Sequence, residues 1–170
     1  MPAYSEPYST LLNAVAGRLV NAGADAGPFD HADQVKLWVD EALDELMPSD
    51  ELKAELSRDV PIALVCDGGS RPGPDSPENS DGVDEQQTVK VYFCASSPTM
   101  VAAITGDGTK YWGTGAIKHW VLSRLAARTW ATGITGWEPL KWVETRPVAV
   151  PQVGRAIMVA TFTSLRQQAL

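Results

Sequence analysis

The chain is poor in the two residue types that most often carry chemistry, with only two cysteines and two histidines in 170 residues. Cys66 and Cys94 form no C-x-x-C pair, which argues against zinc binding and redox chemistry. If a hairpin joins the strands that carry them, Cys66 lies near the turn and Cys94 about six residues away from it. At about 3.3 Å per residue the two thiols are then ~20 Å apart, which is too far for a disulfide. We therefore expect two free, buried thiols.

Long hydrophobic runs are also missing. No apolar run approaches the ~20 residues that a membrane-spanning helix needs. The first six residues lack the basic start and the apolar core of a signal peptide. These absences predict a protein that is made and used in a cytoplasm, with no membrane partner.

No residue pattern marks a catalytic or metal site. His31 is expected to be an exposed residue at a helix start, and His119 has no acidic or histidine partner one helical turn away with which to hold a metal. The glycine-rich fragment 68–71 is too short for a phosphate loop, and the acids of 67–87 lack the regular spacing of a calcium loop. We expect no enzyme activity, no cofactor and no metal.

Positive charge is scarce in the first part of the chain. The net charge is −7, yet residues 1–106 carry 18 acidic and 6 basic side chains, whereas residues 107–170 carry 3 acidic and 8 basic ones. The acidic total argues against a primary grip on nucleic acid, which needs clustered Lys and Arg. An acidic half and a basic half can instead complement each other between subunits. The alternative is that both surfaces are merely solvated.

Apolar periodicity predicts the helices. They are expected at 10–22, at 32–47, at 50–57 after the capping residue Ser49, and at 115–131 after the capping residue Thr114.

Strands are indicated by a continuous apolar run and by alternating segments. They are expected at 60–66, 88–97, 140–145 and 155–165, with a short further strand at 101–104. The continuous run 60–66 is typical of a strand buried on both faces. The acidic segment 67–87 is expected to be a long flexible loop. This order predicts one α+β domain over residues 1–170, with an antiparallel or mixed sheet of about four to five strands packed against N-terminal and central helices.

Aromatic residues are more informative than the polar ones. The chain has six tryptophans, five of them from Trp112 onward. Trp120 and Trp130 are expected in the core because they lie on a predicted helix. Tyr111, Trp112 and Trp137 stand beside glycines in loops, where little of the domain covers them. Exposed aromatic residues are typical anchors of protein interfaces; the alternative is a tryptophan-rich core under long loops.

Four features follow one another in a distinctive order. They are the amphipathic helix with its small-residue loop (11–25), the buried strand Val60-Pro61-Ile62-Ala63-Leu64-Val65, the glycine-rich turn Gly113-Thr114-Gly115-Ala116-Ile117 leading into a helix, and the closing strand Ala156-Ile157-Met158-Val159-Ala160-Thr161-Phe162. In this order they resemble the tail terminator proteins of tailed bacteriophages, in particular those of Mu-type contractile tails. The resemblance spans most of the chain, although the helix at 50–57 and the segment 67–87 do not map onto it.

The resemblance implies a ring, commonly a hexamer, that sits on the last ring of the tail tube, stops its growth and joins the tail to the neck or head-closure protein. DNA would pass through the ring without sequence-specific binding, and the tail sheath is a further candidate partner. The protein would belong to the virion tail and neck after assembly in the host cytoplasm. The family carries no catalytic residues.

Basic side chains of the central helix are candidates for the contact between subunits, together with the loop aromatics. The candidate interface residues are Tyr111, Trp112, Lys118, Arg124, Arg128 and Trp137. Three alternatives stay open: another head–tail connector or tail-completion protein, a monomeric peptide-binding module, and a small enzyme with His31 at the edge of a pocket.

Overall fold

The sequence folds into an α+β structure around an open mixed sheet of five strands, as predicted. The computed structural model describes residues 7–20, 27–38, 49–58, 60–73, 85–95, 112–126, 136–148 and 156–166. None of the helices within these ranges is long and apolar enough to cross a membrane.

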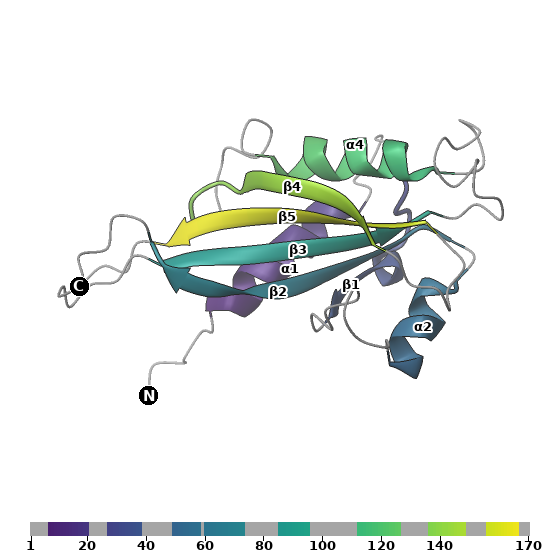
Figure 1. Ribbon diagram of the computed structural model, residues 1–170, viewed down its shortest axis with the longest axis horizontal. Coiled ribbons are helices and arrows are strands. Elements are labelled where there is room, and N and C mark those ends of the chain that lie inside the picture. The colour runs from purple at the N-terminus through teal and green to yellow at the C-terminus, as the bar shows by residue number, and fades with distance from the viewer. Residues whose placement is uncertain are drawn as a thin grey trace.

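The described helices are α1 (Pro7–Leu19), α2 (Asp50–Leu56) and α4 (Thr114–Leu125), with a single 3₁₀ turn, η1 (Ala32–Gln34). The strands are β1 (Val35–Trp38), β2 (Ile62–Pro72), β3 (Glu85–Cys94), β4 (Lys141–Val148) and β5 (Ile157–Arg166). Their order across the sheet is β1-β2-β3-β5-β4 (Figure 1). β1 runs parallel to β2, and all other neighbours are antiparallel. The two edges of the sheet are therefore β1 and β4.

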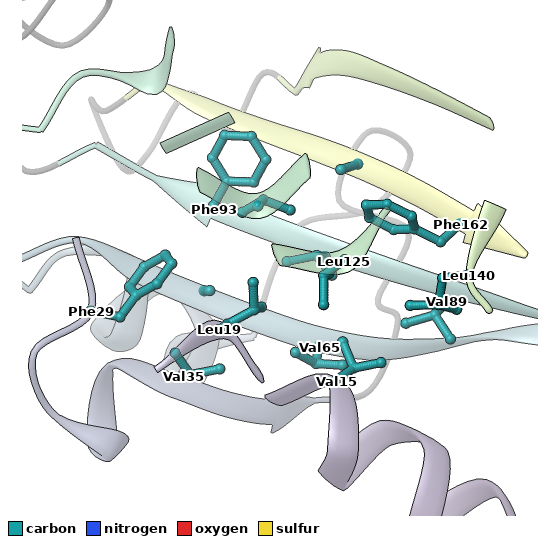
Figure 2. Packing of buried hydrophobic residues seen from close by; sticks show 14 of the residues in the cluster. Val15, Leu19, Phe29, Val35, Val65, Val89, Phe93, Leu125, Leu140 and Phe162 are labelled. Atoms are coloured by element: carbon teal, nitrogen blue, oxygen red, sulfur yellow. The ribbon is translucent and has the colours of Figure 1, made fainter. Parts of the chain in front are cut away.

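The sheet is buried on both faces near β2, as the continuous apolar run predicted. Ala63 and Val65 point into the larger core cluster, which also holds residues of α1 and α4 (Figure 2). Ile62, Leu64 and Cys66 belong to a smaller cluster on the other face. α2 covers that cluster with two of its leucines, at positions 52 and 56. Alternate residues of β3 and β5 divide between the two clusters in the same way, because successive side chains of a strand point to opposite faces.

Both capped helices occur, with one change of cap. The backbone N–H of Leu52 donates to the Ser49 side chain at 3.2 Å, so Ser49 caps α2 as predicted. Thr114 is instead the first residue of α4, and Gly113 stands at the cap. α4 ends at Leu125 because Ala126 has extended backbone, so the prediction of a helix that continues through residue 126 is wrong; residues 127–131 lie outside the described ranges.

The helix predicted over 32–47 is wrong for residues 32–38, which form η1 and β1; residues 39–48 lie outside the described ranges. The cause is a tertiary contact. The buried Gln34 side chain donates to the carbonyl oxygens of Pro28 and Pro61, at 3.3 and 3.0 Å, and accepts from the N–H of His31 at 2.9 Å. These bonds hold this segment beside the start of β2, where pairing with the sheet outweighs helical periodicity.

The prediction of a loop over 67–87 is wrong at both ends, since β2 continues to Pro72 and β3 begins at Glu85. A register shift lies between Asp67 and Ser70, and past it the two strands pair again. The backbone N–H of Gly69 donates to the Asp67 carboxylate at 2.7 Å within this irregularity. A β-bulge of this kind lets pairing continue through a polar sequence. Residues 74–84 lie outside the described ranges.

Both cysteines are buried thiols that form no disulfide, as expected. They lie on the same face of the sheet in the smaller cluster. Cys66 pairs with Lys90, which stands four residues before Cys94 on β3. At about 3.3 Å per residue this separation is ~13 Å, too far for a disulfide.

Candidate functional site

The proposed interface residues that the structure describes, Trp112, Lys118, Arg124 and Trp137, do not form one exposed cluster. Trp112 is half-buried immediately before α4 and packs against the larger core cluster. Lys118 is half-buried on α4. Tyr111, Arg128 and the expected strand 101–104 lie outside the described residues.

Arg124 holds α4 against α1. Its Nε donates to the carbonyl oxygen of Arg18 at 3.1 Å, and the Nε of Arg18 donates to the carbonyl oxygen of Arg124 at 3.2 Å. The Arg124 guanidinium also lies 5.0 Å from the ring centre of Trp120, whose indole N–H donates to the Leu19 carbonyl oxygen at 2.9 Å. Both arginines thus satisfy carbonyls near helix C-termini, where such groups lack partners within the helix. Arg124 has an intrachain structural role that the sequence did not predict.

Trp137 is buried, with 6% of its surface exposed, so the expectation of an exposed loop aromatic is wrong for this residue. Gly136, directly before Trp137, has a positive φ of 86°. The N–H of Glu138 donates to the Leu165 carbonyl oxygen at 2.8 Å, and Ser164 Oγ donates to the Glu138 carbonyl oxygen at 2.6 Å. These bonds fix the segment against the end of β5 and turn the indole into the larger cluster.

Ionisable side chains gather between η1, β1 and α2. Arg58 forms an ion pair with Asp33 at 2.7 Å and a longer one with Glu55 at 3.4 Å, while Lys36 contacts Glu55 at 2.5 Å. The hydrogen bond from Arg58 lowers the pKa of the Asp33 carboxyl and raises the pKa of Arg58 itself. This network ties α2 to the edge strand β1.

The described residues contain no group of three His, Cys, Asp or Glu side chains placed to hold a metal ion. His31 is exposed beside η1, and His119 is exposed on α4.

The exposed large hydrophobic residues of the described segments are confined to the two edge strands. Leu37 on β1 is 42% exposed, and Trp142 and Val143 on β4 are 49% and 56% exposed. β1 and β4 stand at opposite edges of the sheet (Figure 1). Unpaired strand edges with exposed apolar side chains are recurrent contact surfaces.

The start of β4 is irregular in a way that explains this exposure. Trp142 pairs with Phe162 and Glu144 with Thr161, so Val143 is an extra residue at a bulge. The Trp142 indole N–H donates to Thr145 Oγ1 at 3.0 Å, which holds the ring along the edge. Lys141 and Glu144, on either side of the apolar pair, are also exposed. We name residues 141–144 the β4 patch.

The sequence itself contains a signal for the β4 patch. Two adjacent apolar residues between two charges, Lys141-Trp142-Val143-Glu144, break the alternation expected of a half-buried strand. Such a break indicates either a bulge or an apolar side chain on the solvent side. Leu37 gave no such signal, because its segment was predicted to form a helix and not an edge strand.

No protein-family model matches the chain, and no curated protein matches its sequence.

Proposed function

We propose that the protein is a structural subunit of a bacteriophage tail, a terminator that forms a ring on the end of the tail tube and joins the tail to the neck. The order of the sequence features first suggested this family. What supports the proposal in the fold is the chemistry of the two sheet edges.

The two edges differ, and this difference is the observation that carries the proposal. β1, β2 and β3 come from the acid-rich part of the chain, while β4 and β5 come from the base-rich part. The strand order β1-β2-β3-β5-β4 therefore puts a strand of the first part at one edge of the sheet and a strand of the second part at the other. Each edge also presents an exposed apolar side chain, Leu37 on one and Trp142 on the other.

Contact between unlike edges is heterologous, and repeated heterologous contact gives a closed ring when the rotation per subunit closes. A ring built in this way leaves the helices that cover the two faces of the sheet available for contact with the tube, the neck protein or the lumen. An acidic surplus would let DNA slide through the lumen because it offers the phosphates few cations.

The first experiment measures the mass of the purified protein by light scattering over a range of concentration, alone and with isolated tail tubes. We expect a closed ring, alone or at the tube end, and tubes of limited length when the protein is present. A protein that stays monomeric and leaves the tubes unchanged would refute the proposal.

Two arginine variants locate the ring contact. Leu37→Arg places a charge in the apolar edge of β1 and should abolish the ring without unfolding the chain. His119→Arg adds the same side chain at an exposed position of α4 and should leave the ring intact. The opposite result would move the subunit contact from the sheet edges to α4, where the sequence had placed it.

A further inference from the structure

The β4 patch has a property that the ring does not require: it is complementary to itself. Its sequence runs Lys141-Trp142-Val143-Glu144, with a base at one end, an acid at the other and two apolar residues between them. All four side chains are exposed.

Antiparallel alignment of two such patches about a two-fold axis gives a specific register. With the axis between positions 142 and 143, Lys141 of each copy faces Glu144 of the other, and Trp142 of each copy faces Val143 of the other. The contact then contains two opposite-charge pairs around an apolar centre. Directly opposed side chains are the units that stabilise strand pairing, and this register makes all four pairs favourable.

The rest of β4 limits the contact to this patch. Pro147 has no N–H to donate, and Thr145 already accepts the indole N–H of Trp142. Among the described residues, the ion pair of Glu144 is a long one with Arg146, 3.9 Å between charged atoms, which compensates its carboxylate weakly. The pairing is consequently short, which favours a reversible contact over an irreversible one.

We propose that the β4 patch binds the β4 patch of a second copy of this chain, so that the unassembled protein forms a two-fold dimer. The pairing itself depends only on the patch. Its role depends on the proposed ring function: the dimer covers the edge that the ring needs, and each subunit must leave the dimer before it joins a ring. The same edge thus regulates when assembly begins.

Charge reversal with rescue tests the register. Lys141→Glu places two glutamates opposite each other at both ends of the contact, and Glu144→Lys places two lysines there. Each single variant should raise the dimer dissociation constant about tenfold, since two attractive pairs become repulsive. The double variant K141E/E144K restores both pairs and should recover the wild-type constant.

Mixing gives a second rescue. An equimolar mixture of Lys141→Glu and Glu144→Lys chains should form a 1:1 heterodimer, because every opposed pair is again of unlike charge. Sedimentation velocity at low salt measures the dimer dissociation constants of the variants and of the mixture. Higher salt should reduce the differences between these constants, because it screens the charged pairs. Far-UV circular dichroism and the melting temperature check that each variant is folded. Trp142→Ala, which removes the apolar centre, should weaken the dimer about tenfold or more.

The outcomes separate this inference from the ring proposal. If the double variant and the mixture fail to recover the dimer, or if wild-type chains do not dimerise, the self-pairing is refuted. A ring that forms on tail tubes in spite of that result leaves the proposed function standing. Conversely, a rescued dimer with no effect on tail tubes supports the pairing and refutes the ring.

Discussion

Replacing Gln34 by Met tests why residues 32–38 form a turn and a strand. Gln34 is 5% exposed and makes three hydrogen bonds through its amide: to the carbonyl oxygens of Pro28 and Pro61 and from the N–H of His31. Met fills a similar volume but can neither donate to the two carbonyls nor accept in the same way. Both prolines are buried, so their carbonyl oxygens have little access to water.

The magnitude follows from these bonds. A buried polar group that loses its partner costs about 1–3 kcal/mol, and two carbonyls lose a donor here. Burial of the apolar Met side chain offsets part of the loss, at about 25 cal/mol per Å². We expect Gln34→Met to lower the free energy of unfolding by about 2 kcal/mol. β1 should lose protection most, since Gln34 precedes it directly.

Urea unfolding followed by tryptophan fluorescence measures the change, and hydrogen exchange of the β1 amides locates it. The matched control is Gln86→Met, because Gln86 is only half-buried and bonds through its Oε1 to Arg71 Nε, at 2.6 Å. The control should cost less than about 0.5 kcal/mol. Equal effects of the two substitutions would refute the reasoning and favour the helical alternative, in which Gln34 has no buried partners.

Two further predictions concern single contacts. Gly68→Ala should destabilise the chain by about 1–3 kcal/mol in urea, because an added Cβ would lie 2.8 Å from Thr88 Cγ2; Thr88→Ser, which removes that methyl group, should recover part of the loss, and no recovery would contradict the clash. The ion pair with Arg58 lowers the folded-state pKa of Asp33 below its usual 3.8. Its stabilising contribution is therefore present above about pH 4 and lost as the pH falls through the lowered pKa. Arg58→Met should make the loss of stability below pH 4 shallower, as measured by unfolding at a series of pH values, and an unchanged slope would exclude the pair as its source.

Local pattern was sufficient to predict four of the five strands and, in β3, which side chains share a face. In β3 the alternation of Val89, Val91 and Phe93 with Tyr92 and Cys94 predicted which side chains share a cluster, and the structure confirms it. This succeeds because strand periodicity is a property of the backbone itself. Core assignments made from it require no knowledge of the partner strands.

The misassigned positions depend on contacts between distant segments. β1 exists through the bond from Gln34 to Pro61, 27 residues along the chain. Trp137 is buried because its neighbour Glu138 bonds to the end of β5, at Leu165. Neither partner can be identified from the local sequence. The exposure of Trp142 in the β4 patch could not be predicted for the same reason, because it depends on which strand stands at the edge of the sheet.

The two proposed contacts of β4, with a second β4 and with β1 of a neighbour, differ in the residues that they use. This difference sets the order in which they form during assembly. Self-pairing is confined to residues 141–144, because Pro147 beyond them has no N–H to donate. Contact with the β1 edge of a neighbour instead involves the exposed apolar side chain of Leu37. A short self-complementary pairing therefore dominates when subunits meet singly in solution. A tube end that holds several subunits side by side raises their effective concentration and shifts the balance to the ring.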